Sequence, residues 1–210
     1  MSCITDICPI CTFDVARLPT LPKLSGRLSG LANLALTLRC TAYYYHEIAS
    51  STSKTAAAMF ASKRLGKELQ KMHDKLPPGI TLIQAEDFKT WLVDIQVMDN
   101  NPLYAGETYR LKFVFSDSYP IEAPEVTFVK DAEHPIPWHP HIYSNGIICL
   151  DLLDRSGWSP VHNVESVCVS LQSMLTSNTK KERPQGDDNF VRYNTQRPRD
   201  INFVFHDETV

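Results

Sequence analysis

The sequence predicts an α+β domain, in which one helix is followed by an antiparallel meander of strands and then by a second helix. Apolar residues recur at helical spacing over 56–73 and again over 164–175, and between these segments they alternate with polar residues. The links between the alternating segments are short, as expected for neighbouring antiparallel strands. With 43% hydrophobic and 21% charged residues, the chain has an ordinary globular composition and can form a packed core.

The first 54 residues differ in composition from the rest of the chain. They hold five basic and three acidic side chains, whereas the remainder holds 16 basic and 21 acidic ones. Leu-Pro and Ser-Gly pairs argue against a compact unit here. We therefore predict a poorly ordered extension over 1–54 and a core domain over 55–210, with an irregular tail from about 194. The extension weakly resembles a transit peptide, and a dispensable segment is the other interpretation.

The six cysteines do not form a disulfide framework. Four lie in the first forty residues, and only Cys149 and Cys168 lie in the body of the chain. No signal peptide is evident, so we expect a reducing compartment, cytoplasmic and/or nuclear. Cys8 and Cys11 form a CxxC pair, but a zinc knuckle needs a second pair, so unpaired thiols are favoured. We expect no membrane partner, because no apolar run reaches the roughly 20 residues of a span. We expect no nucleic-acid partner, because the net charge is only −3.

The helix predicted over 56–73 should end at Pro77-Pro78-Gly79. Its polar face is basic, which indicates either a solvated surface or a docking surface; the residues are Lys63, Arg64, Lys67 and Lys71. Alternating apolar residues then predict strands over 91–97 and 109–115, and a third near 126–128.

Residues 130–162 show neither a helical nor a strand period, and a long irregular segment inside a compact domain is usually functional. The helix predicted from Val164 to Leu175 follows, with Asn163 as its N-cap. Cys168 belongs to the apolar stripe of this helix, so we interpret it as a small buried hydrophobe.

The irregular segment carries four motifs in order. His139-Pro140 is followed by the Asn145-Gly146 turn and by Ile148-Cys149-Leu150, with Asp151 two residues beyond the cysteine. Tyr119-Pro120 with Pro124 lies upstream, and Trp158-Ser159-Pro160 lies downstream. This set resembles the active-site signature of the ubiquitin-conjugating enzymes over residues 59 to about 193.

The resemblance implies the fold of that family, with a four-stranded antiparallel meander, and an acyl transfer in which Cys149 carries ubiquitin as a thioester. No bound cofactor is implied, since ATP is consumed upstream by the ubiquitin-activating enzyme. Asp151 is then expected to orient or deprotonate the incoming amine, His139 to fix the loop through hydrogen bonds, and Asn145 to shape the groove. Asp188 is a candidate acidic partner across that groove, or a residue of a solvated turn.

The resemblance also implies two partner surfaces. The basic face of the first helix, with Lys63, Arg64 and Lys67, is expected to meet the activating enzyme. Ile121, Pro160 and Val161 occupy positions that contact a RING or U-box ligase, although Ile121 replaces a more usual aromatic residue.

His141 departs from the usual family pattern, which has Asn after the His-Pro pair to stabilise the developing oxyanion. Loss of such a donor costs about 2.7–4 kcal/mol in other enzymes, and the tautomer and charge of an imidazole vary with pH. The same His-Pro-His occurs in the W class of the family, which modifies the α-amino group of substrate N-termini. The stretch after Pro184, including residues 187–190, shows no helical periodicity, which also resembles the short irregular tail of that class.

Several alternatives stay open from the sequence. Lysine could be the acceptor, or a ubiquitin-like modifier could be the cargo. The chain could be a non-catalytic binding module with the same fold, or an unrelated cysteine hydrolase. A metal site formed by His139, His141 and Cys149 is the weakest alternative, because no fourth ligand stands at suitable spacing.

Overall fold

The first helix buries one face against the rest of the fold. In the computed structural model, which describes residues 54–154, 156–201 and 203, this helix covers residues 54–74 and ends before Pro77-Pro78. Ala61, Leu65 and Met72 are its core residues. The helix predicted over 56–73 is thus confirmed, whereas the predicted extension lies outside the described residues except for its last residue.

A four-stranded antiparallel sheet follows in the order β1-β2-β3-β4. Its strands are β1 (Ile80–Gln84), β2 (Thr90–Gln96), β3 (Thr108–Val114) and β4 (Glu125–Val129). The alternation seen in the sequence becomes one buried face, because successive side chains of a strand point to opposite faces. Val93 pairs with Leu111, and both side chains are fully buried. Strand β1 lies at the edge and buries only one residue, which explains why alternation alone did not reveal it.

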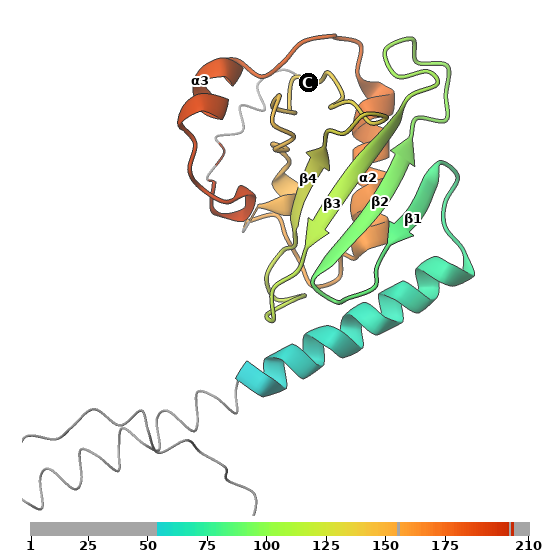
Figure 1. The fold of residues 1–210 in the computed structure, drawn as a ribbon, viewed down its shortest axis with the longest axis vertical. Coiled ribbons are helices and arrows are strands. Elements are labelled where there is room, and N and C mark those ends of the chain that lie inside the picture. The colour runs from blue at the N-terminus through green and yellow to red at the C-terminus, as the bar shows by residue number, and fades with distance from the viewer. Residues whose placement is uncertain (1–53, 155, 202, 204–210) are drawn as a thin grey trace, which may run out of the picture. The chain divides into compact units, whose positions relative to one another are not determined.

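Helix α2 (Val164–Ser177) packs against the sheet as the second layer (Figure 1). Asn163 is its N-cap, as predicted, and its side-chain oxygen accepts a hydrogen bond from the Ser166 backbone N–H at 2.8 Å. The Ser166 hydroxyl accepts one in return from the Asn163 N–H at 3.0 Å, which completes a capping box. Cys168 is fully buried on the sheet side of α2, and burial raises the pKa of its thiol. Its interpretation as a buried hydrophobe is confirmed.

A buried carboxylate joins the first helix to the loop between β3 and β4 and to α2. The carboxylate of Glu68 accepts hydrogen bonds from the Tyr119 hydroxyl at 2.7 Å and from the Val164 backbone N–H at 3.0 Å. The Arg64 guanidinium pairs with the same carboxylate and also donates to the His162 carbonyl. A buried charge is tolerated only when it is paired in this way, so Glu68 fixes where the helix sits.

The C-terminal part contains a helix that the sequence did not predict. Residues 187–190 were expected to be irregular, but α3 (Asp187–Tyr193) begins there after Gly186, whose φ is +77°. The two aspartates in its first turn favour a helix N-terminus electrostatically. The seven residues bury no side chain fully, and so leave no apolar stripe for a periodicity to detect.

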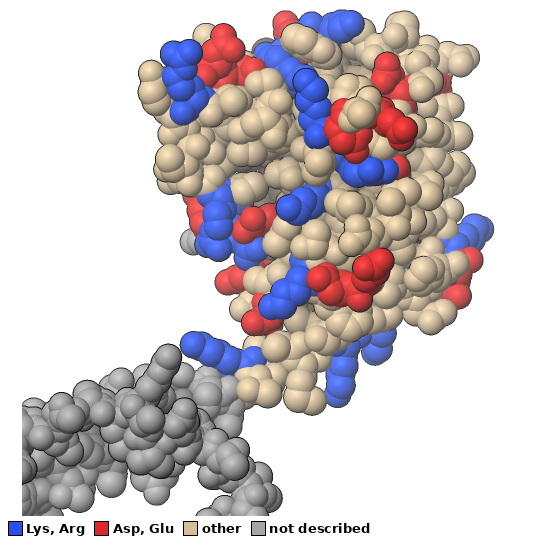
Figure 2. Space-filling model, viewed as in Figure 1, with Lys and Arg blue, Asp and Glu red and all other residues tan. Residues whose placement is uncertain are grey.

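The chain then forms what we call the C-terminal strap, residues 197–201 and 203, which includes the short 3-10 helix η3 (Pro198–Asp200). Arg199 donates to Glu125 of β4 at 2.7 Å, and Ile201 is buried. The strap therefore lies along β4. No helix in the described part of the chain is long and apolar enough to cross a membrane. Lysine and arginine side chains are interspersed with acidic ones on the face shown in Figure 2.

Candidate active site

The irregular segment doubles back on itself and brings His141 against Cys149. Isolated antiparallel bridges pair His139 with Ile142 and Ile142 with Ile148. The Cys149 backbone N–H donates a hydrogen bond to the His141 carbonyl at 2.8 Å. Two residues that lie eight positions apart in the chain are therefore locked side by side.

The Asn145-Gly146 turn makes this return possible. Gly146 has a φ of +88°, and its N–H donates to the Tyr143 carbonyl at 2.9 Å. The Asn145 side chain accepts from the N–H of Ile147, and the Gly146 carbonyl accepts from the N–H of Phe128 in β4. A Cβ atom at position 146 would lie 2.0 Å from the Phe128 carbonyl oxygen. Only glycine fits, both for its φ and for this close approach.

His139 lies inside the loop rather than facing solvent, with only 5% of its surface exposed. Its Nδ1 accepts a hydrogen bond from the His141 backbone N–H at 2.9 Å, so that nitrogen carries no proton. Burial, with a smaller effect of His141, lowers the pKa of His139 to about 4. The ring is thus neutral at pH 7 and constrains the loop that bears His141.

The Cys149 thiol is partly exposed, as a carrier must be. Burial and, to a smaller extent, the charges of Asp151 and Asp154 together raise its pKa to about 11. The resting thiol is therefore protonated at pH 7. Cysteine hydrolases instead activate the thiol with an adjacent cation or base, whereas the described groups that act on the pKa of Cys149 all raise it.

Asp151 is exposed at the start of the 3-10 helix η2 (Asp151–Leu153), and its side chain accepts from the Leu152 N–H at 2.7 Å. Its charge contributes to the raised pKa of the Cys149 thiol. His141 has an exposed side chain, and its ring lies 5.5 Å from that of His139. Among the residues described, no three His, Cys, Asp or Glu side chains gather as a metal site would require, and Nδ1 of His139 is already engaged.

Helix α3 contacts the active-site loop through residues that the motif search missed. The Asp187 carboxylate accepts a hydrogen bond from the Ser144 N–H at 2.8 Å, and the Phe190 ring stacks on Tyr143 with 3.8 Å between centroids. Asp188, the predicted acidic residue, is exposed and lines an open hollow together with Ser144. Asp187 and Phe190 could have been identified from the sequence only if α3 had been recognised as a helix.

Arg183 is a further residue with no sequence signal. Its guanidinium donates to the carbonyls of Ile136 and Pro137 and to that of Ile142, at 3.0, 2.6 and 3.1 Å. It also lies over the Trp138 ring, 4.5 Å from the ring centroid. From the sequence, a basic residue in a polar tail is expected to be a solvated charge. In the fold, Arg183 instead contacts the active-site loop.

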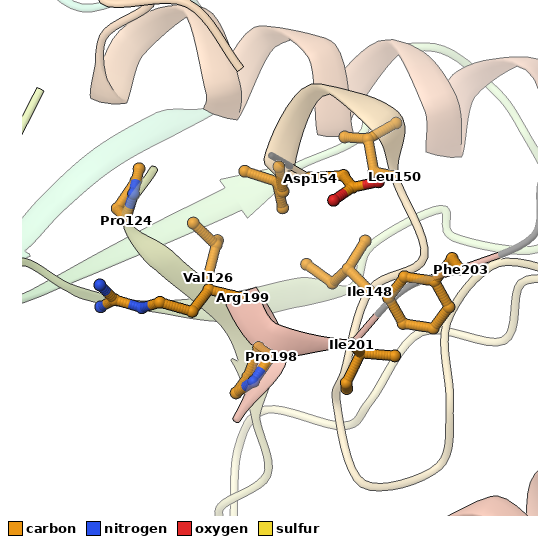
Figure 3. A pocket seen from close by; sticks show the side chains of 10 residues that line it. Pro124, Val126, Ile148, Leu150, Asp154, Pro198, Arg199, Ile201 and Phe203 are labelled. Carbon is orange, nitrogen blue, oxygen red and sulfur yellow. The ribbon is translucent and has the colours of Figure 1, made fainter. Parts of the chain in front are cut away.

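The strap supports the active-site segment from its other side. Ile148 and Leu150, which flank Cys149, line a small cavity with Val126 of β4 and with Ile201 and Phe203 of the strap (Figure 3). The C-terminal part of the chain thus contacts the loop at several separate points. This support was not predicted, because a tail of irregular sequence gives no indication of where it packs.

The predicted partner residues fall into two groups. Lys63 and Lys67 are exposed, whereas Arg64 is engaged with Glu68 and the His162 carbonyl. Ile121 is 75% exposed, and Pro160 and Val161 are also exposed. The Trp158 indole N–H donates to the Pro120 carbonyl at 2.8 Å, and this bond brings the two loops of the second group together.

A partly exposed cysteine on a loop next to a four-stranded antiparallel meander is an arrangement suited to a transferase that carries its cargo as a thioester. A family model described as ubiquitin-conjugating enzyme matches residues 64–203, and the chain belongs to that family. It is 42% identical over 163 residues to ubiquitin-conjugating enzyme 15 of Arabidopsis thaliana, covering 77% of this chain and 98% of the relative.

The relatives also show where in the family the chain lies. It is 40% identical over 150 residues to a probable ubiquitin-conjugating enzyme E2 W of Dictyostelium discoideum, with 71% of this chain and 97% of the relative covered. The crystal structure of the ubiquitin-conjugating enzyme UbcA1 from Agrocybe aegerita matches with 48% identity and a TM-score of 0.63, covering 66% of this chain and 98% of that one. The protein is a ubiquitin-conjugating enzyme close to the W class.

Proposed function

We propose that Cys149 accepts ubiquitin from the activating enzyme and passes it to the α-amino group of substrate N-termini. In the first step the Cys149 sulphur attacks the carbonyl carbon of ubiquitin held as a thioester on the activating enzyme. The new C–S bond forms, the old one breaks, and the thiol proton passes to the departing sulphur. In the second step an amine attacks the same carbon, and the Cys149 sulphur leaves with the proton that the amine gives up.

The surroundings of Cys149 support the second step. An attacking amine becomes positively charged before it loses its proton, and Asp151 lies close enough to the sulphur to influence its pKa. A carboxylate at that point stabilises the cation and receives or relays the proton. The same negative charge disfavours the free thiolate. The Cys149 sulphur is therefore a weak nucleophile before the activated partner binds.

The choice of acceptor rests on a single observation: His141, whose carbonyl holds the Cys149 N–H at 2.8 Å, stands where most of the family has Asn. A site without that amide stabilises the oxyanion less well, so it depends more on an amine that is already deprotonated. An α-amine has a pKa near 7.7–8.0 against about 10.4 for lysine, so at pH 7 its free-base fraction is larger by a factor of several hundred. Substrate N-termini can therefore react without strong assistance.

Membership of the family implies partners as well as chemistry: ubiquitin, an activating enzyme and a ligase. Lys63 and Lys67 are the exposed basic side chains that we assign to the activating enzyme, and Arg64 contributes mainly by holding Glu68. Ile121, Pro160 and Val161 form the exposed apolar surface that we assign to a RING or U-box ligase.

The carrier role is tested by incubating the full chain with activating enzyme, ATP and ubiquitin. We expect an adduct that a thiol reductant removes. Cys149→Ala should abolish it, and Cys149→Ser should give an ester that resists thiols but not alkali. Cys168→Ala is the matched control and should still form the adduct. An adduct that persists in Cys149→Ala would refute the assignment.

The acceptor is tested with lysine-free peptides whose N-termini are free or acetylated, and with free lysine blocked at its α-amine. We expect transfer only to the free N-terminus, and we expect His141→Asn to raise the rate toward lysine relative to the α-amine. His73→Asn, an exposed change remote from the loop, should leave the ratio unchanged. An unaltered ratio in His141→Asn would remove the argument from His141. Replacing ubiquitin by a ubiquitin-like modifier tests the alternative cargo.

A further inference from the structure

Most carbonyl groups of the segment from Ile136 to Ile142 accept hydrogen bonds from outside the segment. Pro137 and Pro140 have no N–H, so the segment has few donors of its own and cannot form a regular ladder. Its internal backbone hydrogen bond runs from the Ile142 N–H to the His139 carbonyl at 3.0 Å. The Trp138 carbonyl accepts from the Tyr104 hydroxyl at 2.6 Å. Three other carbonyls, those of residues 136, 137 and 142, are held by one side chain, Arg183.

Two successive carbonyl groups in this segment are held by different partners. The His141 carbonyl accepts from the N–H of Cys149 at 2.8 Å, and the next one, at Ile142, accepts from Arg183 at 3.1 Å. These two contacts act together with the hydrogen bond from the His141 N–H to His139 to hold His141 beside the sulphur-bearing residue. One of the two is made by the carrier itself, and the other comes from the C-terminal part of the chain.

An arginine is the side chain suited to this place. Its planar guanidinium carries five N–H donors in a rigid fork, whereas lysine offers three donors from one point. The guanidinium is also held from one side by Trp138, 4.5 Å away, in a cation–π contact. The fork can therefore bridge carbonyls on both sides of His139, which lie six residues apart in the chain, and keep them in register.

We propose that Arg183 is a positioning residue for the transfer step, which holds the loop bearing His141 at the geometry required when the amine attacks the Cys149 thioester. This inference rests on the proposed carrier role of Cys149. Displacements of about 1 Å at a reacting centre can reduce a rate about 100-fold. Loading from the activating enzyme depends on that enzyme's own docking and thioester, so the discharge step is the one that Arg183 affects more.

The experiment measures the two steps separately in the full chain. Wild type, Arg183→Lys and Arg183→Ala are loaded with ubiquitin, the activating enzyme is stopped, and discharge to a peptide with a free N-terminus is followed over a range of peptide concentrations. We expect loading to be changed by less than about threefold, and the maximal discharge rate to fall at least about tenfold with little change in KM. Lys181→Ala removes an exposed positive charge two residues away and should behave as wild type.

Chemical rescue separates positioning from stability. Discharge by Arg183→Ala should recover in part when guanidinium ion is added at millimolar concentration. Tetramethylammonium, which has no N–H and cannot serve as an acceptor, should not rescue it. Trp138→Leu keeps the three hydrogen bonds but removes the ring over the guanidinium, so it should slow discharge by a smaller factor. If Arg183→Ala does not fold, Trp138→Leu tests the proposal in its place.

The outcomes distinguish the two proposals. If wild type itself forms no adduct at Cys149, the carrier role fails. If wild type loads and folded Arg183→Lys discharges within twofold of it, Arg183 only stabilises the loop and the inference is wrong. Equal slowing of loading and discharge would also overturn its assignment to the transfer step.

Discussion

The reactivity of the Cys149 thiol should be suppressed well below that of an ordinary cysteine. Its pKa is raised to about 11, mainly by burial, from an ordinary value of 9.0. At pH 8 about one molecule in a thousand then carries the thiolate, against about one in ten for an ordinary thiol, which is a factor of about 100. A more basic thiolate is intrinsically more nucleophilic, with a Brønsted slope of about 0.4–0.5, and this recovers a factor of six to ten. We therefore expect Cys149 to react about tenfold more slowly at pH 8.

The assay is alkylation of the full chain by iodoacetamide between pH 7 and 11.5, with each cysteine-containing peptide quantified by mass spectrometry. A synthetic peptide of residues 144–154 serves as the reference, because it keeps Asp151 and Asp154 but removes burial. The midpoint of the rate profile should lie well above 9 in the protein and near 9 in the peptide. Cys168 should remain unmodified while the fold persists.

The contribution of charge is measured with Asp151→Asn. Burial is the largest cause of the raised pKa, so this variant should lower the Cys149 midpoint yet leave it above the ordinary value. A midpoint at or below 9 in the folded wild type would refute the reasoning. It would mean that the thiol is solvated or paired with a cation.

Three further predictions concern the scaffold. Gly146→Ala should destabilise the protein by about 3 kcal/mol or more in chemical denaturation, because its Cβ would lie 2.0 Å from a β4 carbonyl at a φ of +88°. Arg199→Ala should lower the free energy of unfolding by about 1–2 kcal/mol and speed proteolysis of the strap, because this mostly buried guanidinium pairs with two glutamates. The free energy of unfolding should fall as the pH drops from about 6.5 to 4. In this range His139 binds a proton in the unfolded chain, whereas in the folded protein, where its pKa is about 4, it stays neutral.

Each of these predictions has a control that shares the chemistry but not the contact. Gly106→Ala also has a positive φ, but no atom lies within 4 Å of the new Cβ, so it should cost only about 1–2 kcal/mol. Arg197→Ala removes a side chain that is 64% exposed and should cost less than about 1 kcal/mol. His139→Gln should flatten the acid slope between pH 6.5 and 4. An unchanged slope would show that other groups cause it.

The sequence predicted the layers of the fold well, because both helices and the two central strands bury one face each and so carry a period. The burial of Cys168 was predictable for the same reason, and Asn163 was predictable as the N-cap because an Asn stands directly before the apolar stripe. Strand β1 and helix α3 escaped, since an edge strand with one buried residue and a seven-residue surface helix leave too little pattern.

The candidate site, like the fold, could be predicted from the sequence only in part. The residues around Cys149 could be named from the chain because short-range chemistry specifies them: Gly146 for its positive φ, the prolines for their missing N–H, and His141 for its place after the His-Pro pair. The order of these motifs was enough to indicate the family and the type of transfer.

What holds those residues in place was decided only by tertiary structure. Arg183 under the loop, Asp187 on the Ser144 N–H and Phe190 on Tyr143 all come from a segment that lies some forty residues further along the chain. Their contacts depend on hydrogen bonds and ring stacking across that separation, and such contacts leave no local period in the sequence. The environment of the Cys149 thiol is likewise a property of packing, because desolvation exists only once the loop has folded against β4 and the strap.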